Sequence, residues 1–145
     1  MAEKLAVRAG ARAAGVKEEA VARRLARAGD LGSVAEALLA DRALPRTKLS
    51  VTEVHRVLSK AAHASGAGAQ SVRLAAVADL LTRASPLEAR YLVRTVTGKL
   101  RLGIGDATTL DALAEAYGGG RAARVEVERA YNLTSDLGLV AERIA

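Results

Sequence analysis

The chain contains no phenylalanine and no tryptophan, and this absence limits how it can build a core. Only three tyrosines are present, so the interior must come from Leu, Val, Ile and Ala. Alanine has the highest helix propensity, and its small side chain lets neighbouring helices approach closely. With 145 residues, the chain is about the size of one domain and can bury a substantial core. We therefore expect a single all-α domain of closely packed helices over residues 1–145.

Glycines and capping residues divide the sequence into helices. Residues 50–53 and 85–88 both have the capping-box pattern, in which a serine oxygen and a glutamate carboxylate each accept a backbone N–H. No segment shows the alternation that is typical of a strand. The sequence predicts helices over residues 2–13, 17–28, 33–41, 51–64, 70–84, 86–101, 106–117, 122–132 and 137–144.

One short segment occurs twice in the chain. Residues 29–36, GDLGSVAE, recur as residues 135–142, SDLGLVAE. In each copy the aspartate is suited to cap the helix that follows it. The separation is too long for a solenoid repeat, which spans about 20–50 residues. The repeat favours two related helical halves within one domain, although two helix caps could also match by chance.

The formal net charge of +6 favours a polyanionic partner, chiefly nucleic acid or an acidic membrane surface. Arg90, Arg94, Thr97 and Arg101 share one face of the helix predicted over residues 86–101. A row of like charges on one face suits an anionic ligand. A solvated arginine face on an ordinary globular protein is the alternative.

Two glycine-containing loops add to this basic character. In the first, Lys99 and Arg101 precede Gly103 and Gly105, which open the start of the next helix. The unpaired N–H groups at a helix start form an anion site, and glycine lets a ligand approach the backbone. The carboxylate of Asp106 would compete with a phosphate if it turned toward this site. The alternative is that these glycines only turn the chain.

The second loop, residues 65–71, is also made of small residues. Lys60 lies before it, and Arg73 lies in the first turn of the helix that follows. Two such loops in one basic domain suggest contacts with a row of phosphates. Because the chain has few aromatic residues for stacking bases, a duplex is favoured over a single strand.

The sequence offers no catalytic or metal site. It has no cysteine, which excludes disulfides and thiolate ligands. His55 and His63 lie about 12 Å apart along one predicted helix, too far to share a metal ion. The start of the chain has no signal region, and no apolar run is long enough to span a membrane. We expect a cytoplasmic protein with no membrane partner.

Four segments, taken together, resemble the N-terminal DNA-binding domain of ATP-dependent DNA ligases, of the archaeal type and its bacterial relatives. They are GDLGSVAEALL (29–39), LSVTEVHRVLSKAAHASGAGAQSVRLAAVADLL (49–81), EARYLVRTVTGKLRLGIGDATTLDALAEAYG (88–118) and VERAYNLTSDLGLVAE (127–142). The resemblance implies an all-helical fold with two pseudo-symmetric halves, truncated at its N-terminus. It also implies binding to the minor-groove side of nicked duplex DNA, in association with the prokaryotic nucleoid.

The same resemblance implies which residues contact the DNA backbone. These are Lys60, Ser65, Gly66, Gly68, Gln70, Ser71, Arg73, Arg90, Arg94, Lys99, Arg101, Gly103, Gly105 and Ser135. The implied role is to hold nicked DNA during replication and repair, while the adenylation and OB-fold domains of a parent ligase act on it.

The sequence also departs from the family pattern. The adenylation motif Lys-x-Asp-Gly is absent, so we expect this chain alone not to be an enzyme. ATP and Mg²⁺ are implied only for the parent ligase. Relatives often carry a Gln and paired-Phe motif for a sliding clamp, but residues 41–48 contain no aromatic residue. We therefore do not expect clamp binding there. The alternative function is a helical protein-interaction scaffold whose basic face docks an acidic partner.

Overall fold

The computed structural model describes residues 2–42, 48–101 and 103–145, which contain nine α-helices and no strand. The helices are α1 (Ala2–Ala14), α2 (Glu18–Ala28), α3 (Leu31–Ala40), α4 (Val51–His63), α5 (Ala69–Arg83), α6 (Pro86–Thr97), α7 (Asp106–Tyr117), α8 (Arg124–Thr134) and α9 (Leu137–Ile144). A 3₁₀ turn, η1 (Arg121–Ala123), precedes α8. The predicted all-α fold is confirmed. Within the described ranges, no helix is long and apolar enough to cross a membrane.

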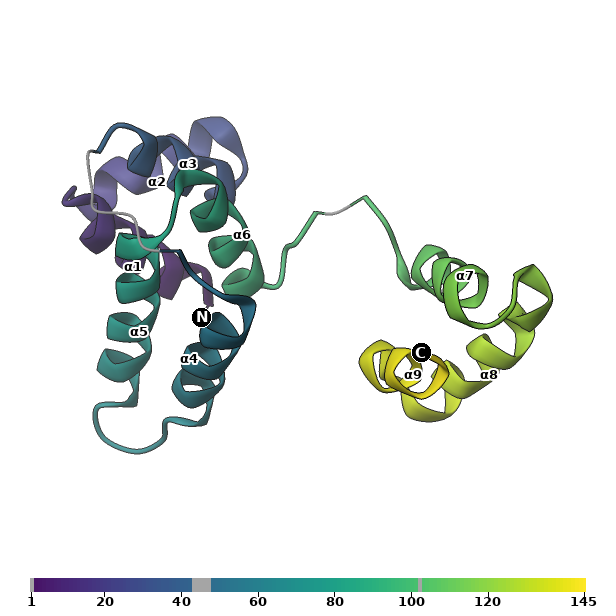
Figure 1. Cartoon of the computed structure of the whole chain (residues 1–145). Helices are drawn as coiled ribbons and strands as arrows, with labels where there is room; N and C mark the ends of the chain where they lie inside the picture. The colour runs from purple at the N-terminus through teal and green to yellow at the C-terminus, as the bar shows by residue number, and fades with distance from the viewer. Residues whose placement is uncertain (1, 43–47, 102) are drawn as a thin grey trace. The chain divides into compact units, whose positions relative to one another are not determined.

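The chain forms two compact units (Figure 1). Each unit has its own apolar core. Unit 1 spans Met1–Leu100 and contains α1 to α6. Unit 2 spans Arg101–Ala145 and contains α7 to α9.

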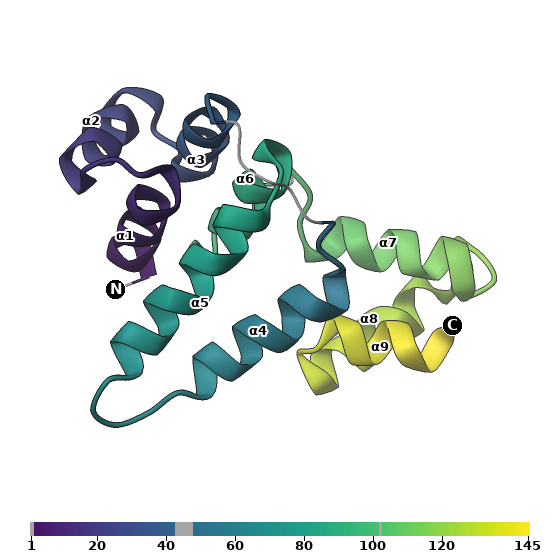
Figure 2. The ribbon, with the colours of Figure 1, turned by 60° about the vertical axis from the view of Figure 1, so that its left-hand side comes forward.

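The core of unit 1 is built largely from alanine, valine and leucine. Ala9 of α1 and Ala89 of α6 are completely buried, and α1 packs against α2, α3, α5 and α6. Leu80 and Leu81 of α5 are fully buried in the same core cluster. Helices α4 and α5 contact each other and are joined by a loop at one end of the unit (Figure 2). The expectation of closely approaching alanine-rich helices is confirmed.

The tightest helix contact in unit 1 joins α3 and α6. A Cβ atom on Gly32 would lie 2.8 Å from the carbonyl oxygen of Arg90 and 2.8 Å from Cγ of Arg94. Both distances are too short for a real side chain. Gly32 is therefore the residue that lets α6 lie against α3 at this separation.

A partly buried ion pair fixes the same interface. Asp30 caps α3, because its Oδ2 atom accepts bonds from the backbone N–H and the hydroxyl of Ser33 at 3.0 and 2.7 Å. Arg94 donates to the same oxygen at 2.8 Å, and the two side chains are only 11% and 14% exposed. The bond from Arg94, reinforced by those from Ser33, holds the pKa of Asp30 well below its usual range.

Both copies of the sequence repeat adopt the same local structure. Gly29 and Ser135 end α2 and α8 with left-handed backbones, at φ values of 66° and 52°. Asp30 and Asp136 then cap α3 and α9 by accepting the N–H of the residue three positions later, each at 3.0 Å. The predicted helix–Asp cap–helix motif is confirmed in both units.

Two local predictions were wrong. Helix α6 ends at Thr97 and not at residue 101, because Gly98 takes a left-handed backbone (φ 69°) and Lys99 donates its N–H back to Arg94 at 2.9 Å. At the start of α4, Ser50 accepts the N–H of Glu53, but the glutamate carboxylate pairs with Arg83 at 2.6 Å. That ion pair replaces half of the predicted capping box.

The glycine contact predicts an asymmetry between the two copies of the repeat. Gly32→Ala should lower the free energy of unfolding by about 1–3 kcal/mol, because the new methyl group overlaps α6. Gly138→Ala should be neutral or stabilise its helix by about 0.5–1 kcal/mol, since its Cβ would meet only the Asp136 carboxylate, at 3.2 Å. Urea unfolding followed by circular dichroism measures both, and equal effects would contradict this account of the packing.

The Asp30–Arg94 pair predicts a pH dependence of stability. Because folding lowers the pKa of Asp30, its contribution is complete above the ordinary aspartate pKa near 4 and is lost as the pH falls further. Between pH 7 and pH 3, the free energy of unfolding should fall less for Asp30→Asn than for the wild type. Asp136→Asn is the matched control, since asparagine also caps helices well. If the free energy of unfolding of Asp30→Asn falls as much on acidification as that of the wild type, the prediction is contradicted.

Candidate nucleic-acid interface

The first candidate loop joins α4 to α5 at the end of their pair (Figure 2). Residues 65–68 are exposed, and Gly66 and Gly68 have positive φ values of 76° and 90°. Gly68 is the N-cap of α5, and it has no side chain to accept the N–H groups at the start of this helix. Gln70 and Ser71 lie in its exposed first turn. The loop therefore presents open backbone at a helix N-terminus, as the sequence predicted.

Basic residues flank this loop in two different ways. Lys60 is exposed on the last turn of α4. Arg73, in contrast, donates to the carbonyl oxygens of Ala61, Ala62 and Ala64 at 3.2, 3.4 and 2.7 Å. Its guanidinium caps the C-terminus of α4 and fixes the geometry of the α4–α5 turn. Arg73 is thus placed as a residue that shapes the loop.

The second candidate loop begins at the end of α6. Lys99 lies 3.0 Å from the carboxylate of Glu3, but both side chains are more than half exposed, so the pair contributes little to stability. Arg101 is exposed and adopts a left-handed backbone with a φ of 53°, which is uncommon for a residue with a Cβ. These two cations are held on the segment that follows the helix, not on the helix itself.

The start of α7 has the backbone arrangement that the sequence predicted. Gly105 is its N-cap and offers no side-chain bond, and Gly103 has a φ of 74°. A Cβ at either position would meet nothing within 4 Å, so the space beside the backbone is open. Helix starts with open backbone of this kind bind anions.

Asp106 is the first residue of α7, and its carboxylate was considered in the sequence analysis as a competitor for phosphate. Its carboxylate accepts a bond from the Tyr131 hydroxyl at 2.7 Å, which raises the pKa of that tyrosine. The bond turns the carboxylate toward α8. Its negative charge nevertheless stays near the N-terminus of α7.

The predicted cationic row on α6 is arranged differently from the expectation. Arg94 pairs with Asp30 in the α3–α6 interface, and Arg90 pairs with Glu36 there. Arg101 lies beyond the end of the helix. Because Arg90 and Arg94 form ion pairs with residues of α3, they are not displayed together on a solvated face.

Ser135 lies at the joint between α8 and α9, where its left-handed backbone ends α8. It is exposed, and a direct role in binding DNA stays a prediction.

The expectation that residues 41–48 do not bind a sliding clamp is not tested, because residues 43–47 lie outside the described residues.

The charge is unevenly divided between the two units. After residue 100, the basic residues are Arg101, Arg121, Arg124, Arg129 and Arg143. The acidic residues there are Asp106, Asp111, Glu115, Glu126, Glu128, Asp136 and Glu142. Unit 2 therefore has a net charge of −2, from five basic and seven acidic residues, and unit 1 has a net charge of +8, which together give the total of +6.

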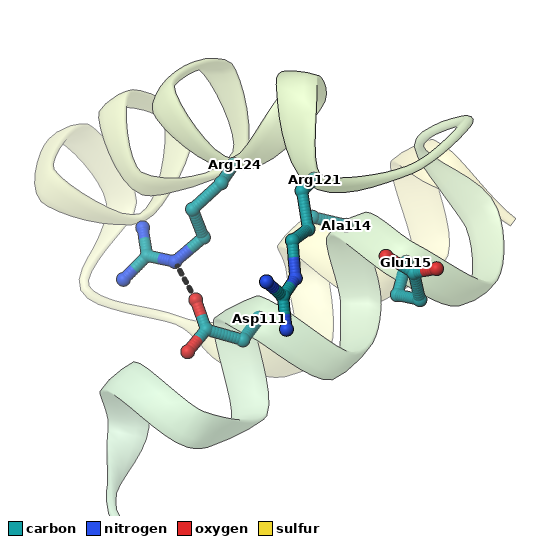
Figure 3. Close-up of a pocket in the computed structure, with 5 residues that line it drawn as sticks. All are labelled: Asp111, Ala114, Glu115, Arg121 and Arg124. Atoms are coloured by element: carbon teal, nitrogen blue, oxygen red, sulfur yellow. Dashed lines mark hydrogen bonds and ion pairs between the residues drawn. The ribbon is translucent and has the colours of Figure 1, made fainter.

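A hollow on unit 2 is lined by two arginines, Arg121 and Arg124, that the sequence analysis did not identify (Figure 3). Arg121 and Arg124 follow the Gly118–Gly120 cluster, which could have signalled them. Arg124, however, donates to Asp111 at 2.5 Å and to Glu128 at 2.9 Å. With Glu115 also in its lining, the hollow has mixed charge and is poorly suited to a phosphate. In the part of the chain that the structure describes, no three His, Asp or Glu side chains gather to hold a metal ion.

Comparison with known proteins identifies the family of this chain. Residues 1–114 match the family described as DNA ligase N terminus. The chain is 43% identical to a DNA ligase of Sulfolobus acidocaldarius and 47% identical to one of Aeropyrum pernix, and these alignments cover 100% and 99% of the chain. It is 46% identical, over 99% of its length, to a probable DNA ligase of Aquifex aeolicus. The chain spans about a quarter of the length of these relatives, 25–26%. The chain belongs to the DNA ligase N terminus family.

Proposed function

We propose that this chain binds duplex DNA without sequence preference, on its minor-groove side, and positions nicked DNA for an ATP-dependent DNA ligase. One observation carries the proposal. Two helices, α5 and α7, each start at an exposed glycine with no side-chain cap. Lys60 lies on the last turn of the helix before α5, and Lys99 and Arg101 lie on the segment before α7. Membership in a family whose relatives are named DNA ligases supports it.

In this proposal, backbone N–H groups and cations share the binding of phosphates. The N–H groups at the two helix starts donate to phosphate oxygens, and Lys60, Lys99 and Arg101 neutralise charge and release counterions. Ser65, Ser71 and Gln70 add side-chain donors beside the first loop. Contacts of this kind position a protein on DNA but do not read its sequence.

The partly buried arginines support the binding loops indirectly. Arg73 fixes the α4–α5 turn, and Arg94 with Arg90 fixes α6 against α3, so that the segment after Gly98 leaves from a defined place. Their loss would weaken DNA binding through the shape of unit 1 and not through the number of phosphates that are neutralised.

The reaction itself is assigned to other parts of a parent ligase. None of the five lysines is followed by the x-Asp-Gly sequence that adenylation needs, so ATP and Mg²⁺ belong with the adenylation and OB-fold domains of such a parent. In this proposal the working protein acts in the cytoplasm, on nucleoid DNA that is undergoing replication or repair.

The proposal predicts a steep dependence of DNA binding on salt. For phosphates neutralised by the three cations Lys60, Lys99 and Arg101, the log–log slope of the binding constant against salt should be about −2.7, at about −0.9 per phosphate. The double variant Lys99→Ala/Arg101→Ala should make the slope shallower by about 1.8 and should weaken unrelated duplex sequences alike. Fluorescence anisotropy with labelled duplexes at several salt concentrations measures both effects.

A matched control separates local contacts from net charge. Arg23→Ala/Arg24→Ala removes the same charge from the exposed face of α2, and it should leave the slope nearly unchanged. A control that weakens binding as much as the test variant, or a loss confined to one DNA sequence, would contradict the phosphate-contact proposal.

A further inference from the structure

The two copies of the repeat have the same local structure but different surroundings. In unit 1, α3 is covered by α6 through Asp30, Gly32 and Glu36. In unit 2, the corresponding residues of the repeat are Asp136, Gly138 and Glu142, and all three are exposed. The second copy therefore repeats the residues that bind a helix in the first copy.

The helix of the second copy is less buried than that of the first, but the residue that faces its own core is not. Val34 and Val140, which face the cores of their own units, are equally buried at 3% and 2%. On the face that α6 covers, Leu31 is buried, whereas its counterpart Leu137 is half-buried. Ala35 and Ala141 differ in the same way. The second copy thus keeps its packing at Val140 but has no counterpart of α6 over Gly138 within the described part of unit 2.

The charges on this face of α9 also lack the partners that they have in α3. Within the described part of unit 2, Asp136 accepts the N–H of Leu139 but pairs with no cation, and Glu142 makes no ion pair. Unit 2 as a whole has more acidic than basic residues. The face suits a basic partner.

We propose that the face of α9 formed by Asp136, Gly138 and Glu142 docks a protein helix that carries two arginines four residues apart. In unit 1, Arg90 and Arg94 have this spacing and reach Glu36 and Asp30, while the α6 backbone passes over Gly32. The partner helix would lie on α9 in the same way. Its arginines would bind Glu142 and Asp136, and its backbone would pass over Gly138.

The α6 sequence itself is the probe for this face. A fluorescein-labelled peptide of residues 85–100, SPLEARYLVRTVTGKL, is titrated with the full chain, and its anisotropy is followed. Saturable binding is expected. Replacing both arginines of the peptide by glutamine should weaken the affinity at least about tenfold, which is the effect of losing about 1.4 kcal/mol. This change cannot unfold the protein.

Variants of the protein locate the peptide. Gly138→Leu should abolish binding by filling the path of the helix, and Glu142→Gln should weaken it about tenfold or more. Glu126→Gln is the charge-matched control on the exposed surface of α8, and it should bind like the wild type. Circular dichroism of each variant confirms that it is folded.

Two results would overturn the inference. One is the absence of saturable binding by the wild-type chain. The other is binding that Gly138→Leu and Glu142→Gln leave unchanged, because the peptide would then occupy another site, such as the α6 position on α3. Neither result bears on DNA binding by the glycine loops, so the two proposals can fail separately.

Discussion

The contact between α3 and α6 is the constraint on which the rest of unit 1 depends. Gly32 removes the side chain that would separate the helices, and Asp30 receives Arg94 at the same place. Because one oxygen of Asp30 also caps the N-terminus of α3, a single carboxylate fixes both the start of this helix and its packing against α6. The position of α6 in turn sets where the chain leaves toward Lys99. The proposed DNA-binding segment thus starts from a rigid support.

The repeat shows how one sequence motif serves two surroundings. In both units a left-handed residue and an aspartate cap turn the chain from one helix into the next. In unit 1 the acidic residues of the motif are neutralised by a neighbouring helix, whereas in unit 2 they stay exposed. The motif encodes a helix corner together with an acidic docking face, and only the first copy has its face covered within its own unit.

Most of the helices could be predicted from the sequence because caps and glycines act locally. Ser85 with Glu88, and Asp30 with Ser33, form the bonds that their spacing predicts. The interactions that were missed are between distant parts of the chain. Nothing near Glu53 signals that it binds Arg83, thirty residues away.

The same limit applies to the candidate site. The open backbone at Gly68 and Gly105 was predictable, because a glycine before a helix start lacks a capping side chain whatever surrounds it. The direction of Arg90 and Arg94 was not. Arginines on one helical face suggest a ligand-binding surface, and the sequence does not show that Glu36 and Asp30 of α3 are their partners.

The most direct test of the central claim is the response of individual backbone amides to DNA. Nicked duplex is titrated into the chain, and the amide signals are followed by NMR. We predict that residues 66–71 and 103–108 shift together with a common affinity, while α2 stays unchanged. Shifts on α2 alone, or at neither glycine loop, would contradict the claim that these open helix starts bind phosphate.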